Sequence, residues 1–205
     1  NVAAAKYEDL AFICYTSGTT GFPKGAMLSF RNFLSMAANL MEVDNKFEKD
    51  EFVSFLPLAW IGEQMMCLSS ALLTGFTVNF PEKPETVQEN IREIGPTIMF
   101  SPPRIWENMT STVQVKVMDA SALKRWMYNW ALPVGYAYSD AVFRKEAIPP
   151  LLRLKQKLAY ALVFRALKDR LGLLRIRSAS TGGAALGPDV FKFFNAMGVN
   201  LKQIY

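Results

Sequence analysis

One stretch of thirteen residues, 13–25, holds the densest set of groups that could do chemistry. It contains five hydroxyls, three glycines and one lysine, and it follows directly on an apolar run that is typical of a strand. Glycines let backbone N–H groups turn into a concave loop, hydroxyls add donors, and Lys24 adds a compact positive charge. This composition indicates a loop that holds phosphate. The stretch reads Ile13-Cys14-Tyr15-Thr16-Ser17-Gly18-Thr19-Thr20-Gly21-Phe22-Pro23-Lys24-Gly25.

The loop does not have the Walker form G-x-x-x-x-G-K-[ST]. The position five residues after Gly18 is Pro23, and Lys24 is followed by Gly25 rather than by Ser or Thr. A different kind of phosphate loop is therefore needed. The alternative is a Ser/Thr/Gly linker that happens to contain a lysine.

The run from Thr16 to Gly25 resembles the AMP-binding signature of the adenylate-forming superfamily, which includes acyl-CoA synthetases, luciferases and peptide-synthetase adenylation domains. The resemblance implies ATP, Mg²⁺ and CoA as the cofactors and co-substrates. It implies that Lys24 is the catalytic cation and that the Thr16 hydroxyl is the metal contact. The phosphate-binding residues that it implies are Thr16, Ser17, Gly18, Thr19, Thr20, Gly21 and Lys24.

A second glycine-rich stretch, residues 180–186, could accept a flat ring. Two adjacent glycines and two alanines leave bare backbone whose N–H and C=O groups can bind an adenine edge, although a tight turn would explain the same residues. The stretch resembles the second nucleotide motif of the superfamily, which implies that Gly183, Ala184 and Ala185 border adenine. Tyr205 resembles the start of Tyr-Gly-x-Thr-Glu, where the tyrosine stacks on adenine and the glutamate holds magnesium. Because the chain stops there, we interpret it as an internal piece of a longer ligase.

A third stretch, residues 57–63, resembles the Pro-x-x-His motif of the superfamily, which lies near the acyl and nucleotide sites. Trp60 stands in place of the histidine. The resemblance implies that Trp60, Ile61 and Gly62 border the acyl site, whereas the alternative is a core tryptophan at the end of a strand. Phe30 likewise stands where the family usually has histidine, just before the pair Arg31-Asn32.

Composition narrows the possible chemistry. The chain has no histidine, which excludes Ser-His-Asp and Cys-His catalysis and His-based zinc sites. Carboxylate adenylation suits this restriction, because it needs positive charge and positioning rather than a proton shuttle. The sequence predicts a cytoplasmic protein for three reasons. Its two cysteines lack metal-ligand spacing, we find no signal peptide, and no apolar stretch is long enough to cross a bilayer. Peripheral contact with the cytoplasmic face of the membrane stays open.

The elements that must position these motifs alternate between strand and helix. The phosphate loop joins two paired strands, 11–15 and 26–28, and Ser29 then caps a helix over 30–43. Further strands are predicted at 51–56, 76–80, 97–100, 173–179 and 199–204, with helices over 62–73, 84–93 and from Pro188 to Gly198. We therefore predict an α/β fold with a mostly parallel sheet of repeated βαβ units and a phosphate loop between two strands.

Residues 102–171 are predicted to be helical, in three segments over 103–117, 121–143 and 151–171. The resemblance makes this region a helical insertion in an N-terminal AMP-binding domain that spans residues 1–205, with the C-terminal domain absent. Residues 144–177 hold 10 Lys or Arg and 2 Asp or Glu. A plain solvated face, contact with an anionic membrane and nucleic-acid binding remain the alternatives, and nucleic acid ranks last because no recognised module accompanies the charge. The last helical segment has one apolar stripe, formed by Leu151, Leu154, Leu158, Ala161, Leu162 and Leu167.

Two further runs, Pro-Pro-Arg-Ile-Trp-Glu at 102–107 and Leu-Lys-Arg-Trp at 123–126, resemble the long-chain acyl-CoA synthetase branch. The implied reaction has two steps. A fatty carboxylate attacks the α-phosphate of ATP to give acyl-AMP and pyrophosphate, and the CoA thiol then displaces AMP. Another adenylating ligase with an aryl or amino acid substrate, and a non-catalytic membrane-surface module, are the alternatives.

Overall fold

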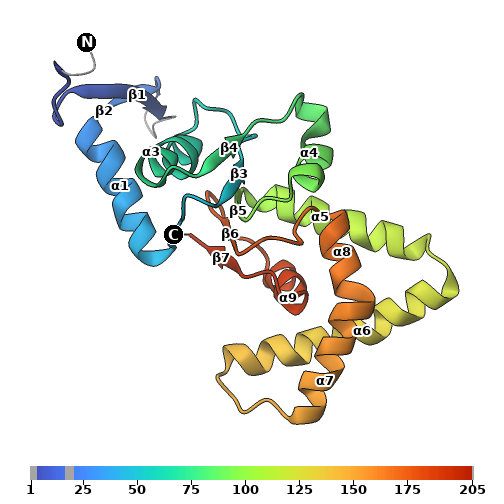
Figure 1. Cartoon of the computed structure of the whole chain (residues 1–205). Helices are drawn as coiled ribbons and strands as arrows, with labels where there is room; N and C mark the ends of the chain where they lie inside the picture. Colours follow the sequence, from blue (N-terminus) through green and yellow to red (C-terminus); the bar gives the residue numbers. More distant parts are fainter. Residues whose placement is uncertain (1–3, 17–20, 205) are drawn as a thin grey trace. The chain divides into compact units, whose positions relative to one another are not determined.

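The computed structural model describes residues 4–16 and 21–204, and the chain divides into two compact units, residues 1–80 and 81–205 (Figure 1). Five residues of the predicted sites lie outside the described residues, so their predicted roles stay predictions. They are Ser17, Gly18, Thr19, Thr20 and Tyr205.

The first unit opens with an antiparallel hairpin of β1 (Leu10–Thr16) and β2 (Lys24–Ser29), in which Thr16 pairs with Lys24. This confirms that the predicted phosphate loop joins two paired strands. A side chain at position 25 of β2 would displace Ile13 on the facing strand, because a Cβ atom there would lie 2.8 Å from Cγ2 of Ile13.

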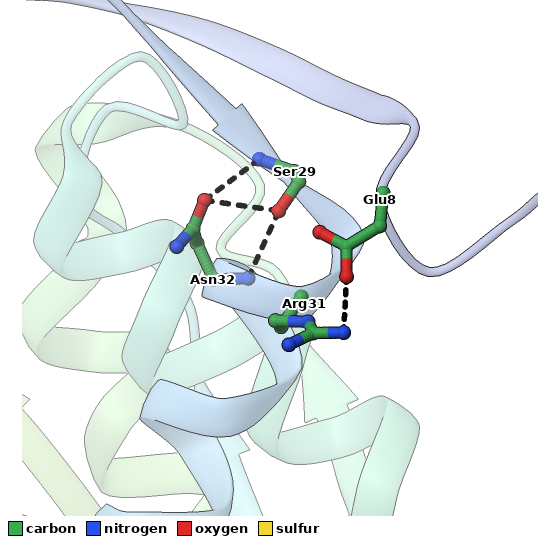
Figure 2. A network of polar contacts seen from close by, with 4 residues as sticks. All are labelled: Glu8, Ser29, Arg31 and Asn32. Atoms are coloured by element: carbon green, nitrogen blue, oxygen red, sulfur yellow. Dashed lines mark hydrogen bonds and ion pairs between the residues drawn. The ribbon is translucent and has the colours of Figure 1, made fainter.

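Helix α1 (Phe30–Val43) begins where the sequence predicted, and a reciprocal cap explains why. The Asn32 N–H donates to Oγ of Ser29 (3.3 Å), while the Ser29 N–H donates to Oδ1 of Asn32 (3.1 Å) (Figure 2). Two of the N–H groups that a helix start leaves unpaired are satisfied in this way. The helix buries Phe33 and Ala37, and the Phe33 ring meets Phe12 of β1 edge to face at 5.3 Å.

The first unit continues with a βαβ arrangement, as predicted. Strands β3 (Glu51–Val53) and β4 (Thr77–Asn79) are parallel, and between them lie α2 (Ile61–Glu63), the π-helix η2 (Gln64–Ser69) and α3 (Ser70–Thr74). The predicted strand over 51–56 is shorter than expected. The ladder extends only one bond further, from the Ser54 N–H to the Asn79 carbonyl (2.8 Å), and Pro57 has no N–H to donate.

The second unit contains a three-stranded parallel sheet in the order β5-β6-β7, formed by β5 (Ile98–Ser101), β6 (Ser178–Thr181) and β7 (Leu201–Gln203). The 3₁₀ turn η3 (Pro84–Thr86) and helix α4 (Val87–Ile94) precede this sheet in the chain, and α9 (Pro188–Ala196) connects β6 to β7. The long segment between β5 and β6 is helical and comprises α5 (Pro103–Met118), α6 (Ala122–Phe143), α7 (Pro150–Ala159), the π-helix η4 (Tyr160–Phe164) and α8 (Arg165–Arg170).

Two predictions about strands were wrong in detail. The predicted repetition of βαβ units would place the strands at 76–80 and 97–100 in one sheet, but within the described residues β4 and β5 belong to separate sheets. The strand predicted over 173–179 begins only at Ser178. Residues 171–176 instead form turns around Gly172, whose φ is +75°, and Leu171, Leu173 and Ile176 are buried there without a ladder. Parallel pairing still dominates, and the α/β class is confirmed.

Candidate nucleotide and acyl sites

The tip of the β1–β2 hairpin presents the two residues that the sequence placed at the ends of the phosphate loop. Thr16 and Lys24 face each other in the register and are both exposed. The Thr16 hydroxyl donates to the Lys24 carbonyl at 3.4 Å, which is long for such a bond and leaves the oxygen available to other groups. Neither of the ion pairs found among the described residues involves Lys24. Its ammonium group is therefore available for an anion.

The base of the hairpin is fixed to α1 by a second set of contacts. The Arg31 N–H donates to the Tyr7 carbonyl (2.8 Å), and the Phe30 N–H donates to the Asp9 carbonyl (3.1 Å). The Arg31 guanidinium forms an ion pair with Glu8 (Figure 2) and lies 5.4 Å from the centre of the Tyr7 ring. The chain that leads into β1 is thereby held to the start of the helix that follows β2.

Trp60 and Gly62, from the predicted acyl stretch, lie against each other at the start of α2. A Cβ atom at Gly62 would overlap the six-membered ring of Trp60, so the indole can occupy its position only because residue 62 is glycine. Trp60 and Ile61 are half-buried rather than enclosed in the core. Part of the indole surface is therefore open to a ligand.

Glu63, which follows this pair, is a residue whose role the sequence analysis missed. Its side chain is fully buried, and the Ser54 hydroxyl donates to its Oε1 at 2.5 Å, while Oε2 has no hydrogen-bond partner within the described residues. Burial raises the pKa of Glu63, which the Ser54 hydrogen bond only partly offsets, so the neutral acid is favoured. The signal in the sequence was the position of Glu63, an acidic residue that lies just before the mostly apolar run 65–73.

The helical segment that follows Glu63 is also irregular. Residues 64–69 form a π-helix, a feature that is frequent at functional sites. Cys67 lies within it, fully buried. Desolvation by burial raises the pKa of the Cys67 thiol to about 11. The thiol is consequently protonated and inert.

In the second unit, the predicted adenine loop follows β6 at the carboxyl edge of the parallel sheet, the edge at which ligands bind in open α/β sheets. Gly183 has φ of +85°, and Gly183, Ala184 and Ala185 are exposed between buried neighbours. The Gln203 amide of β7 holds the loop from both sides. Its Nε2 donates to the Ala184 carbonyl (3.2 Å), and its Oε1 accepts from the Leu186 N–H (3.3 Å).

The sequence alone did not identify two further hydroxyls at the carboxyl edge of this sheet. Ser101 and Thr181 are the last residues of β5 and β6 and are paired in register. Both are fully buried, and neither hydroxyl has a hydrogen-bond partner within the described residues. Buried hydroxyls are normally satisfied, so this pair is a candidate for contact with a bound molecule next to the adenine loop. Only the β5–β6 register brings the two side chains together.

The predicted sites therefore fall into two sets, one in each unit. The hairpin tip and the Trp60–Gly62 pair belong to the first unit, and the adenine loop with Ser101 and Thr181 belongs to the second. The part of the chain that the structure describes holds no group of three or more His, Cys, Asp or Glu side chains able to bind a metal ion. None of its helices combines the length and apolar character needed to cross a membrane.

Comparison with known proteins extends the resemblance over the whole chain. The family model described as "AMP-binding enzyme" matches residues 1–205. The rat long-chain-fatty-acid–CoA ligase ACSBG2 is 31% identical over 212 residues, covering 100% of this chain and 31% of the rat protein. The chain therefore spans about a third of the length of this relative.

Solved structures show the same fold. The A-PCP didomain of carboxylic acid reductase from Segniliparus rugosus, solved in complex with AMP, matches with a TM-score of 0.61 at 24% identity, over 98% of this chain and 24% of that one. A long-chain-fatty-acid-CoA ligase from Archaeoglobus fulgidus, FadD1, matches with a TM-score of 0.57 at 19% identity, over 96% of this chain and 31% of that one.

Proposed function

Because the chain belongs to the AMP-binding enzyme family over its whole length, we propose that it is part of an ATP-dependent ligase that converts a long-chain fatty acid to acyl-CoA. The observation that carries the proposal is the hairpin tip. There a glycine- and hydroxyl-rich loop leaves one strand at Thr16 and rejoins its partner at Lys24, whose ammonium group has no ion pair within the described residues. The similarity to a long-chain ligase at 31% identity supports the choice of substrate class.

The adenylation step requires little from the protein except correctly positioned charge. The fatty carboxylate is already ionised, and its oxygen attacks the α-phosphorus of ATP as the bond to pyrophosphate breaks. Lys24, at the loop that we assign to the phosphates, offsets the negative charge that leaves with pyrophosphate. The loop residues Thr16, Ser17, Gly18, Thr19, Thr20 and Gly21 hold the phosphate oxygens. In the second step the CoA thiol attacks the acyl carbon, and AMP leaves.

The remaining site residues take the roles that the family pattern gives them. Gly183, Ala184 and Ala185 border adenine, and Tyr205 stacks on it. Their exposure, and the hold of Gln203 on the loop, support this assignment. Trp60, Ile61 and Gly62 border the acyl chain.

Magnesium fits the residues present, if phosphate supplies most of its ligands. Mg²⁺ prefers hard oxygen ligands and commonly uses one or two protein groups together with substrate phosphates. The Thr16 hydroxyl is exposed and only weakly bonded, so it can serve as the protein contact from this chain. When bound, the ion would neutralise phosphate charge.

We assign residues 1–205 to the N-terminal AMP-binding domain, with residues 102–171 as a helical insertion. The magnesium-binding glutamate of the family pattern, and the second catalytic lysine that this pattern places in the C-terminal domain, are not among these residues. The 205-residue chain alone is therefore proposed to be inactive, because the charge of the transition state would be only partly compensated.

The test is ATP–pyrophosphate exchange by the full-length protein with four acids, hexadecanoate, octanoate, benzoate and phenylalanine. We expect exchange with hexadecanoate above all, and acyl-CoA formation when CoA is added. Exchange driven by benzoate or phenylalanine would identify an aryl- or amino-acid-activating ligase instead. No exchange with any acid, combined with binding to vesicles, would favour a non-catalytic membrane module.

Peripheral contact with an anionic membrane is also part of the proposal. The basic composition of residues 144–177 supports it. The fold of that region supports a more specific statement.

A further inference from the structure

We propose that the outward face of α7 and η4 binds the surface of a membrane that contains anionic lipid. The inference concerns this surface alone and holds whichever acid the ligase activates. Its centre is a leucine stripe, defined as Leu151, Leu154, Leu158 and Leu162. These side chains are 62%, 55%, 46% and 56% exposed, respectively. An apolar row of this kind on a protein surface marks an interaction site more often than isolated exposed residues do.

The spacing of the leucine stripe places it on one side of the helix. Positions i, i+3, i+7 and i+11 lie on a single face and extend about 16 Å along the axis. Figure 1 shows α7 on the outside of the second unit, against α6. A helix that lies flat on a lipid surface presents its apolar groups as such a row.

The opposite side of the same helix is already packed. Ala159, Val163 and Phe164 are buried, and the Gln156 side-chain amide donates to the Ala196 carbonyl at 3.0 Å. The helix therefore has one face in the core, and this packing fixes the direction in which the leucine stripe points. The leucine stripe is therefore a second apolar face of the helix, on the side away from this packing.

The charges around the leucine stripe have one sign. Residues 147–168 contain five Lys or Arg and no Asp or Glu. Four of the five are exposed, namely Arg153, Lys155, Lys157 and Arg165. Lys168, which the sequence placed with them, is buried, and its Nζ donates to the Gly198 carbonyl at 3.4 Å. Anionic headgroups attract exposed cations of this kind, while the leucines can enter the boundary between headgroups and acyl chains.

Other occupants fit this face less well. A nucleic acid would contact the cations through its phosphates but would leave the leucines between them without apolar contacts. A second copy of the chain would bring two cationic faces together with no acidic side chain from residues 147–168 to compensate, and like charges across an interface are unfavourable. A lipid surface satisfies both the leucines and the cations.

The test is co-sedimentation of the full-length protein with phosphatidylcholine vesicles, with and without 30% phosphatidylglycerol (roughly a third anionic lipid). We expect binding to the anionic vesicles that falls as salt rises. Replacing Arg153, Lys155 and Lys157 with Gln should weaken it about a hundredfold, at roughly fivefold per charge. Replacing Leu154 and Leu158 with Gln should weaken it at least tenfold.

Two matched variants control for net charge and for surface hydrophobicity. Replacing Arg92, Lys83 and Lys116 with Gln removes one Arg and two Lys, all exposed, from parts of the same unit outside α7 and η4. Replacing Leu72 and Leu123 with Gln removes two exposed leucines from outside the leucine stripe. Neither control should change vesicle binding by more than about threefold.

Four results would overturn the proposal. One is vesicle binding that the controls reduce as much as the test variants do. Another is binding that neither test variant changes. The third is a self-association that the Leu154 and Leu158 replacements abolish. The fourth is binding to duplex DNA that depends on Arg153, Lys155 and Lys157 and occurs without vesicle binding. Circular dichroism of each variant checks that the fold is retained.

Discussion

Lys24 provides the sharpest test of the assigned phosphate site. It is exposed at the hairpin tip, and its side chain has no ion pair among the described residues, so replacing it with Ala should change the free energy of unfolding by less than about 0.5 kcal/mol. A charge-assisted hydrogen bond to phosphate contributes roughly 1.5–3 kcal/mol. In the full-length enzyme, Lys24→Ala should therefore slow adenylation by about tenfold to a hundredfold.

The effect should be confined to the first half-reaction, because only that step releases pyrophosphate. Single-turnover measurements separate the two steps, with acyl-AMP formation from ATP measured in one experiment and CoA transfer from supplied acyl-AMP in the other. Lys24→Arg should restore only part of the rate, since the planar guanidinium does not fill a site shaped for an ammonium group. Lys49, an exposed lysine of the same unit, provides the matched control, and Lys49→Ala should leave both steps unchanged.

Two results would refute this reasoning. Equal losses in both half-reactions would mean that Lys24 acts on binding or folding in general and not on pyrophosphate. An unchanged first step would mean that Lys24 does not contact the phosphates, and the assignment of the loop would lose its central residue.

Three further predictions concern buried groups. Because burial raises the pKa of Glu63, its protonation stabilises the fold fully below the ordinary value of 4.5, and this stability is lost as the pH rises through the folded-state pKa. Glu63→Gln should therefore gain stability relative to the unmutated protein in melts from pH 4 to pH 8, and a constant difference would show that the acid is not held neutral. Cys14, which is half-buried, should react with a thiol reagent at pH 7.5 well before Cys67, whose pKa is about 11. Equal reaction rates of the two thiols without denaturant would contradict the burial of Cys67. Thr181→Val should raise the free energy of unfolding by about 1 kcal/mol and should also raise the KM for ATP. A lower free energy of unfolding would mean that the Thr181 hydroxyl has a hydrogen-bond partner in the folded protein.

Much of the local structure could be read from the sequence because it depends on neighbouring residues. Ser29 and Asn32 cap the helix that begins at Phe30 through contacts three residues apart, and Gly75 and Gly95 end helices in the left-handed conformation that glycine adopts readily. The hydroxyl- and glycine-rich loop was recognisable for the same reason. Its chemistry lies in the types and spacing of consecutive residues.

The tertiary structure decided what depends on residues far apart in the chain. The sequence predicted a strand over 173–179, but residues 171–176 form turns in which Gly172 lies close to the backbone of Ile91, where a Cβ atom at residue 172 would be 2.5 Å from the Ile91 carbonyl oxygen. Gln203 holds the adenine loop, and Ser101 lies beside Thr181, only because β5, β6 and β7 pair in one register. No spacing in the sequence encodes that register.

The leucine stripe shows the same contrast between what the sequence predicts and what tertiary packing decides. Periodicity alone established that the helix has an apolar row flanked by cations, and it left open which side of the helix the core would cover. The packing of Ala159, Val163 and Phe164 decided this and turned Leu151, Leu154 and Leu158 outward. A helix can bury only the face that its neighbours complement in shape, and those neighbours come from elsewhere in the chain.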